Sequence, residues 1–184
     1  MKCPGCQEGE LHYTELEPSF PSQKCDVCEG HWIILTDYLS WQSRSQQMDA
    51  AHDIPLKVEM DESKQALLCP VSGKLMLKYR ISHRTSHRLD LSPSVNGIWL
   101  DKGEWELLKQ ERLTDKLNHI FTDPWQKAIQ KESAHETFKA LYARRFGEDN
   151  YAHLKEIRTW LDQQEHRAEI LAYLIAKDPY SAIR

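Results

Sequence analysis

Cys25-Asp-Val-Cys28-Glu-Gly-His-Trp32 is the stretch on which the rest of this chain depends, together with Cys3-Pro-Gly-Cys6. Each stretch holds two cysteines separated by two residues, a spacing that lets one tight turn aim both sulfur atoms at one point. A loop of 18 residues, Gln7 to Lys24, joins the two pairs, as in structural zinc sites. We therefore predict that one structural zinc ion is held by Cys3, Cys6, Cys25 and Cys28.

Two other uses of these cysteines stay open. A disulfide framework fits a short secreted chain, but Met1-Lys2-Cys3 begins the first hairpin almost at once, so we expect no signal peptide. Iron, with a role in electron transfer, also uses two such turns, but Gln7 follows Cys6 where such turns usually have glycine. Zinc is preferred over both.

Composition and charge indicate a soluble protein. The chain has 184 residues, 28% of them charged, and no apolar stretch of membrane length, so we expect a cytoplasmic protein with no membrane partner. Five cysteines, four of them on one metal, fit a reducing compartment. The net charge is −8 over residues 1–62, +4 over residues 63–122 and zero over residues 123–184. Any nucleic acid would therefore bind the middle third.

The first 45 residues read as a zinc ribbon. Strands are predicted at Leu11–Glu17 and Gln23–Cys25, then an apolar run at Trp32–Leu35 and a helix from Tyr38 to about Gln47. Trp32 is expected to pack over the turn that holds the metal. Residues 46–66 are polar and read as a linker, with one possible edge strand at Leu56–Met60.

The pattern then repeats. Cys69-Pro-Val-Ser72 aligns with Cys3–Cys6 at an offset of 66 residues, and Ser92–Trp99 aligns with Cys25–Trp32 at an offset of 67. The second copy keeps one cysteine of four, so we expect no zinc of that kind in it. Residues 67–112 are therefore predicted to be a degenerate, metal-free ribbon.

Both copies resemble the TFIIB-type (transcription-factor) zinc-ribbon domain, whose usual signature runs C-P-x-C, a hairpin, then D-x-C-P-x-C-x-G-x-W-L-D-x-G-E-L. The second copy matches it up to Glu104, except for three cysteines and the final leucine, which is Trp105. The first copy matches all four cysteines, Gly30 and Trp32 but lacks the L-D-x-G-E continuation. The resemblance covers residues 1–45 and 67–112 and implies that the four cysteines are the metal ligands. It is a weak guide to activity.

Without a metal, the second copy needs another source of stability, and we predict a small apolar core. Its expected members are Val95, Cys69, Leu75, Leu77, Ile81, Leu91, Ile98 and Trp99. Cys69 is then a buried small hydrophobic residue, or else a free thiol. A different metal site, built from His83, His87 and Cys69, stays open as a less favoured alternative.

The hairpin of the second copy is basic. Between residues 74 and 88 no acidic residue occurs, and Tyr79 is interleaved with the cations Lys74, Lys78, Arg80, Arg84 and Arg88. This is the best candidate nucleic-acid surface in the chain. The favoured interpretation is an exposed hairpin whose charge balances the acidic first ribbon.

Residues 113–184 are predicted to form a helical domain. A helix opens at Gly103-Glu104, another runs from Thr122 to about Phe146, and an apolar seam runs from Tyr151 to about Lys177 with a possible break near Asp162–Glu165. Glu132 and His135 have the spacing used in di-iron bundles, but such sites need a second pair and two further glutamates.

These observations predict an α+β fold: a zinc ribbon, a second ribbon without metal, and a C-terminal bundle of three to four helices. The favoured function is a non-catalytic adaptor that docks a protein partner or a second copy of itself. The alternative is a nucleic-acid-binding protein that uses residues 74–88. A third hypothesis, an enzyme using His83, His87 or the His135 region, lacks a nucleophile or phosphate-binding motif, and no small-molecule substrate is evident.

Overall fold

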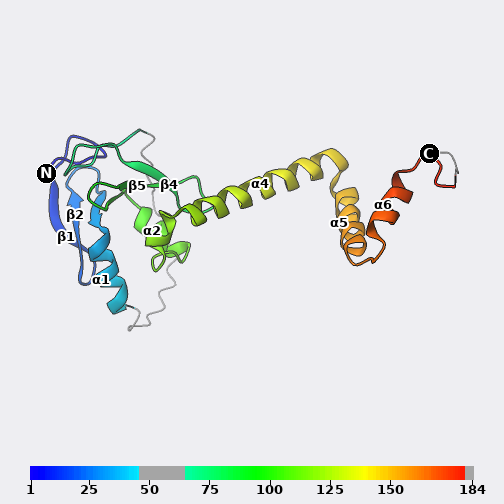
Figure 1. The fold of residues 1–184 in the computed structure, drawn as a ribbon. Coiled ribbons are helices and arrows are strands. Elements are labelled where there is room, and N and C mark those ends of the chain that lie inside the picture. Colours follow the sequence, from blue (N-terminus) through cyan, green and yellow to red (C-terminus); the bar gives the residue numbers. More distant parts are fainter. Residues whose placement is uncertain (46–64, 181–184) are drawn as a thin grey trace. The chain divides into compact units, whose positions relative to one another are not determined.

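Figure 1 shows the fold in a computed structural model, which describes residues 1–45 and 65–180. The fold is α+β, as predicted. The strands are β1 (Leu11–Glu17), β2 (Phe20–Cys25), β3 (His31–Ile34), β4 (Leu77–Arg80), β5 (Arg88–Ser92) and β6 (Gly97–Leu100). The helices are α1 (Leu35–Ser45), α2 (Glu104–Gln110), α3 (Leu117–Ile120), α4 (Asp123–Phe146), α5 (Glu148–Asp162) and α6 (Arg167–Ile175). The possible strand at Leu56–Met60 and nearly all of the predicted linker lie outside the described residues.

The described strands form one six-stranded antiparallel sheet in the order β1-β2-β3-β6-β5-β4. Residues 1–45, here called the cysteine segment, supply β1 to β3, and residues 65–112, the serine segment, supply β4 to β6. The two segments meet at the centre, where β3 pairs with β6 and Trp32 lies opposite Trp99. The sequence predicted two separate hairpin domains, whereas the structure joins their strands in one sheet.

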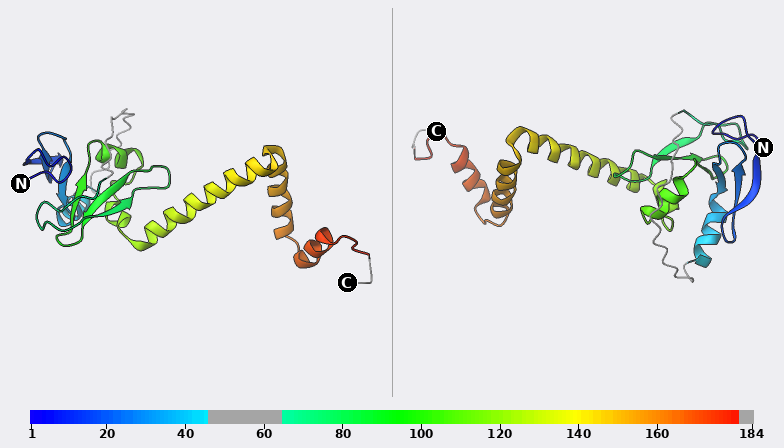
Figure 2. Two further views of the ribbon diagram at one scale, coloured as in Figure 1. Left: turned by 90° about the horizontal axis from the view of Figure 1, so that it is seen from above. Right: turned by 180° about the vertical axis from the view of Figure 1, so that it is seen from behind.

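The two faces of this sheet carry two different cores. Side chains alternate between the faces of a strand, so Ile33 and Ile98 enter one core while Trp32 and Trp99 enter the other. The first core receives buried residues of α1, α2 and α3, and Figure 2 shows α1 and α2 lying against the sheet. The second core contains cysteines of both segments.

Aromatic and polar contacts tie the two segments together in the helical core. Phe20 stacks on Trp41 of α1 at a centroid distance of 5.0 Å, and Trp105 of α2 meets Phe20 edge-on at 5.5 Å. The Tyr38 hydroxyl donates to the Thr114 carbonyl at 3.0 Å and accepts from the Leu117 amide at 3.2 Å. Burial raises the pKa of this hydroxyl to about 12, so it stays protonated as a donor.

The start of α4 covers the outer edge of β4. The Gln126 side-chain amide donates to the Arg80 carbonyl at 2.9 Å and accepts from the Arg80 amide at 3.2 Å, as a neighbouring strand would. The Trp125 indole donates to the Ile81 carbonyl at 3.1 Å. These contacts satisfy backbone groups at an edge that could otherwise pair with another chain.

The chain divides into two compact units, Met1–Glu132 and Ser133–Arg184. The second unit contains the rest of α4, then α5 and α6, with the break between α5 and α6 falling where the apolar seam was expected to break. Leu161 is the buried residue of α5, and α6 has none. Helices α4 to α6 are present as predicted, but most of their apolar side chains are exposed, so these helices do not share the buried core that a bundle would have. Among the described residues, none of the helices combines the length and apolar character that crossing a membrane requires.

Candidate metal centre

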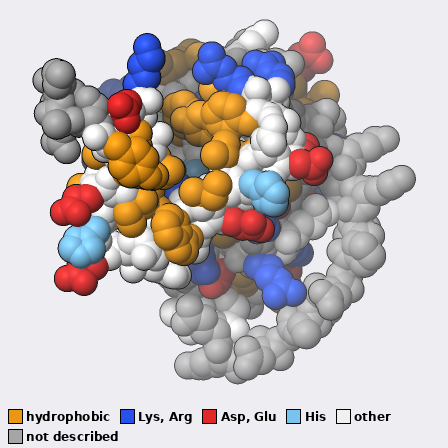
Figure 3. Space-filling model, turned by 90° about the vertical axis from the view of Figure 1, so that its right-hand side faces the viewer, with side chains coloured by type: hydrophobic (Ala, Val, Ile, Leu, Met, Phe, Trp, Pro, Cys, Tyr) orange, Lys and Arg blue, Asp and Glu red, His pale blue; other side chains and the backbone are white. Residues whose placement is uncertain are grey.

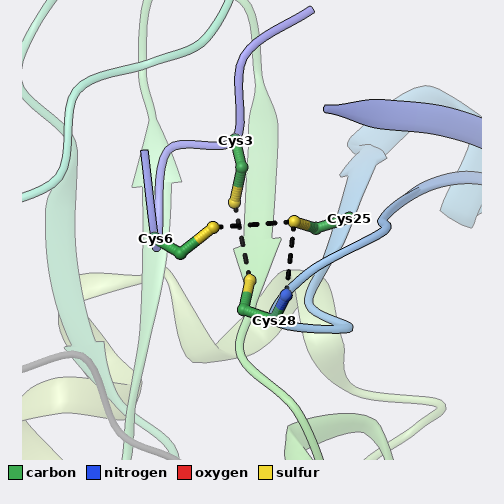
Figure 4. Close-up of side chains that lie close together, drawn as sticks. All are labelled: Cys3, Cys6, Cys25 and Cys28. Atoms are coloured by element: carbon green, nitrogen blue, oxygen red, sulfur yellow. Dashed lines mark hydrogen bonds between the residues drawn. The ribbon is translucent and has the colours of Figure 1, made fainter. Parts of the chain in front are cut away.

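The four N-terminal cysteines converge on one point (Figure 4). Their Sγ atoms all lie within 4.8 Å of one another, with 3.5 Å between Cys3 and Cys28 and 3.7 Å between Cys6 and Cys25. Four thiolates at a Zn–S distance of about 2.3 Å have edges of about 3.8 Å in a tetrahedron. The predicted ligand set therefore forms a cluster beside β-hairpins that can hold one metal ion.

The cysteines are not arranged as disulfides. All five cysteines are free. The Sγ atoms of Cys3 and Cys28 lie 3.5 Å apart, which is far longer than a disulfide bond of about 2.05 Å. The expectation that the N-terminal thiols are not joined to each other agrees with this geometry.

Backbone amides around the cluster point at the sulfur atoms. Gly9 donates to Cys6 Sγ at 3.3 Å, and Val27 and Cys28 donate to Cys25 Sγ at 3.4 and 3.5 Å. Such N–H···S bonds stabilise thiolate charge. Gly9 is required here because a Cβ at this position would lie 2.5 Å from Cys25 Sγ.

Each turn is closed by a residue in the left-handed region directly after its second cysteine. Gln7 has φ 61° and Glu29 has φ 60°. A non-glycine residue in this conformation costs about 1–2 kcal/mol, which the surrounding structure must offset. Gln7 thus adopts the conformation that glycine would supply, so the absence of glycine after Cys6 does not distinguish iron from zinc.

Without a metal, burial keeps part of this cluster protonated. Burial raises the pKa of Cys3 far above its usual range and that of Cys28 to about 11. At Cys6 the smaller effect of burial is outweighed by the amides of Gly9 and Glu8, which lower the pKa to about 7. Metal binding must therefore displace protons from the buried thiols, as is usual for cysteine sites.

The ring that packs on the glycines of these turns is Trp99, whereas the sequence analysis expected Trp32 over them; Trp32 lies in the same buried core as Cys3 and Cys25. A Cβ added at Gly5 would lie 3.0 Å from the Trp99 ring, and one at Gly30 would overlap it. The Trp32 ring instead covers Gly97 of the serine segment, where a Cβ would also overlap the ring. The tryptophan of each segment therefore packs on glycine of the other segment, across the β3–β6 pair.

The serine segment has hydroxyl groups, those of Ser72 and Ser92, at two of the four positions aligned with the cysteines. The Ser94 hydroxyl lies 2.7 Å from that of Ser72 and 3.1 Å from that of Ser92. Burial alone would raise the pKa of Cys69, but hydrogen bonds from Ser72 and Ser92 outweigh it and lower the pKa. Cys69 is buried as predicted, but hydroxyl groups share the role that was assigned to apolar packing alone.

The apolar core predicted for this segment is partly wrong. Leu75 and Leu77 are 56% and 45% exposed, while Met76 and Leu89 take buried places that the sequence analysis did not assign. Met76 lies between the two leucines, where the chain runs from the Leu68–Leu75 bridge into β4, and successive side chains of an extended chain point to opposite sides.

The structure divides the predicted basic surface. Lys78 forms an ion pair with the buried Asp90 at 2.7 Å, and an Arg80 guanidinium nitrogen donates to the Thr85 carbonyl at 3.2 Å. The exposed members of the set are Lys74, Arg84 and Arg88. Two of the five cations therefore have structural partners, and nucleic-acid binding stays an untested prediction.

The structure does not bring His83, His87 and Cys69 together. Among the described residues, two groups gather three or more ligand atoms of the kinds that bind metals: the four cysteines, and Glu132 with His135 and Glu136. The second group lies exposed on one helix, as exposed acidic groups often do without an ion.

A buried carboxyl lies next to His87 and is a residue that the sequence analysis did not single out. Glu104 Oε1 lies 4.0 Å from His87 Nδ1, and neither atom has a hydrogen-bond partner. The other oxygen, Oε2, accepts from the Asp101 amide at 2.8 Å and so closes the start of α2. In the sequence, Glu104 could be recognised only as the glutamate of the W-L-D-x-G-E stretch, and nothing there indicated that its carboxyl is buried.

Glu104→Gln is expected to flatten the dependence of stability on pH. Burial, and then Asp101 and Asp90, raise the pKa of Glu104 well above its ordinary value of 4.5. The folded chain thus keeps a proton that the unfolded chain has lost, so stability must fall as pH rises above 4.5 toward the folded pKa. Urea unfolding of both proteins between about pH 5 and pH 8 measures this slope. Glu106→Gln on the same helix is the control, and equal slopes for Glu104→Gln and the unmodified chain would contradict the expectation.

Comparison with family models, with curated proteins and with solved structures found no match for this chain. The functional reading therefore rests on the cluster and its surroundings.

Proposed function

We propose that this chain is a non-catalytic adaptor in which one structural zinc ion stabilises the sheet and the helical unit docks a protein. The convergence of four sulfur atoms on one point carries the proposal. Four cysteine ligands complete the tetrahedral shell of zinc, so no position is left for water or substrate. A site with four cysteine ligands is therefore typical of a structural zinc ion rather than a catalytic one.

The proposal includes the TFIIB-type ribbon and its duplication. Both segments supply three strands in the same order, each followed by a helix. Each of the four aligned turns also closes with a residue at positive φ: Gln7, Glu29, Gly73 and Asn96. The serine segment uses glycine and asparagine there, which adopt this conformation at low cost. This choice suits turns that have no metal ion to hold them.

The proposed docking surface consists of exposed apolar side chains of the helical unit. Phe138, Tyr142 and Phe146 stack along α4 and are 54%, 41% and 44% exposed. On α6, Leu174 and Ile175 are 59% and 83% exposed. Figure 3 shows hydrophobic side chains exposed on the face seen from the right-hand side of Figure 1. A helix that is apolar on most sides is normally covered.

The charges of this unit favour a second copy of the chain as the occupant. Residues 133–184 carry 8 Lys/Arg and 8 Asp/Glu, so their net charge is zero. Several of these charges pair within the unit, as Lys139 does with Glu136 at 2.7 Å and Arg167 with Asp162 at 3.0 Å. Such a surface neither repels its own copy nor attracts a polyanion.

Self-association is expected to be lost in the double variant Leu174→Gln/Ile175→Gln. Both side chains are exposed, so the substitutions remove apolar contact area without disturbing a core. Sedimentation velocity of the zinc-loaded chain from micromolar to high micromolar concentration should show a dimer for the unmodified protein and a monomer for the variant.

Tyr13→Gln is the control, because Tyr13 is 75% exposed but lies on β1 of the other unit. A monomer at every concentration for the unmodified chain would refute docking of a second copy. Equal association of all three proteins would place the contact elsewhere.

A further inference from the structure

The serine segment touches the metal centre at two places. The Trp99 ring is fully buried and packs on Gly5, inside the first cysteine pair, and on Gly30, directly after the second turn. The Lys102 ammonium group lies 2.8 Å from the Glu29 carboxylate, which belongs to the residue following Cys28. Both contacts come from residues outside the cysteine segment, and neither is a metal ligand.

Trp99 is fixed in this position from both sides. Its indole N–H donates to Asp101 Oδ1 at 2.6 Å, and its backbone lies in β6 opposite Trp32 of β3. A Cβ at Gly30 would overlap the ring, and a Cβ at Gly5 would be in tight contact with it at 3.0 Å. The ring therefore excludes water from one side of the two turns, and its position depends on the serine segment.

We propose that the serine segment is the lid of the metal centre, with Trp99 as the residue that limits how fast the bound metal is lost to solvent. This inference rests on the metal centre proposed above. It gives the second segment a task that needs no metal of its own: it covers the turns that hold the thiolates. Residues that orient metal ligands without binding the metal typically change metal affinity by about 10- to 100-fold when altered, and Trp99 and Lys102 hold the turns that carry the ligands.

The chain supplies a control, because Trp32 and Trp99 are both buried in the same core and oppose each other in the sheet, but only Trp99 packs on the glycines of the cysteine turns. Trp99→Phe removes part of the ring over Gly5 and Gly30, whereas Trp32→Phe removes part of the ring over Gly97. Loss of core packing should destabilise both variants to a similar degree. A difference in zinc-release rate between the two variants therefore measures the effect of covering the cysteine turns, apart from the loss of stability.

The test follows zinc transfer from the full-length, zinc-loaded chain to an excess of a chromogenic chelator, below the unfolding temperature of every variant. We expect Trp99→Phe to release zinc about 10- to 100-fold faster than the unmodified chain, and Trp32→Phe to release it at nearly the unmodified rate. Circular dichroism checks that both variants are folded.

Lys102→Ala gives a second measurement that does not depend on the core, because this side chain is partly exposed. It should also accelerate release, and it carries the test if Trp99→Phe does not fold. Equal rates for the two tryptophan variants, or Lys102→Ala releasing zinc no faster than the unmodified chain when Trp99→Phe cannot fold, would overturn the lid. Absence of bound metal in the unmodified chain would instead refute the metal centre itself.

Discussion

Cys3→Ser is expected to abolish metal binding and to unfold the cysteine segment. A structural zinc ion contributes about 10–16 kcal/mol in finger peptides, which matches or exceeds the whole stability of a typical domain of about 5–15 kcal/mol. Because β3 of this segment pairs with β6, loss of the segment should also remove the central strand pair of the sheet. Elemental analysis should fall from one zinc per chain to none, and the cooperative thermal transition seen by circular dichroism should disappear.

Cys69→Ser is the matched control for this experiment. Cys69 is the fifth cysteine, is equally buried at 2% exposure and occupies the aligned position of the serine segment. It should keep one zinc per chain and a cooperative transition. Retention of zinc by Cys3→Ser would show that the ligand set is wrong, while loss of zinc from Cys69→Ser would place the fifth thiol on the metal.

The triple substitution Ser72→Cys/Ser92→Cys/Val95→Cys is expected to create a second zinc site beside Cys69. The serine segment keeps the turn geometry of the cysteine segment, since the Ser72 amide donates to Cys69 Sγ at 3.4 Å as the Cys28 amide donates to Cys25 Sγ at 3.5 Å. The hydroxyl groups of Ser72 and Ser92 already approach this sulfur. Four thiolates at these positions should complete a tetrahedral set.

Elemental analysis should then give two zinc ions per chain, and the second ion should raise the unfolding temperature. A control with the same number of added thiols, Ser72→Cys/Ser40→Cys/Ser43→Cys, places two of them on α1 and should bind one zinc ion. A triple variant with one zinc ion would show that the second pair of turns has lost the geometry of the first.

The cysteine ligands could be predicted from sequence because their geometry is local. Two residues between cysteines fix the distance between sulfur atoms within each turn, so the spacing identifies the ligands before any fold is known. The same holds for the long helix α4, whose start is marked by Thr122-Asp123-Pro124 and whose end is marked by Gly147. Leu75 and Leu77 show the limit of this reasoning: both are apolar, but their burial depends on which strand lies beside them.

The buried charges of the serine segment show the same limit. Lys78 was read as part of a basic surface, because nothing in a linear sequence places it 2.7 Å from Asp90, twelve residues away on the next strand. Glu104 was hidden for a similar reason, since its burial depends on helix α2 packing against the sheet. In both cases the register of strands and helices decides which charges meet.

The sequence by itself determined the four-cysteine cluster and the α+β order of elements, since both follow from short-range spacing and periodicity. Only the tertiary structure decided that the two segments share one sheet and that Trp99, not Trp32, covers the cysteine turns. The physical reason is that strand pairing between β3 and β6 brings together residues far apart in the chain, Trp32 and Trp99 among them, and the packing of the two rings follows that pairing. Each ring fills the space that a glycine of the other segment leaves open.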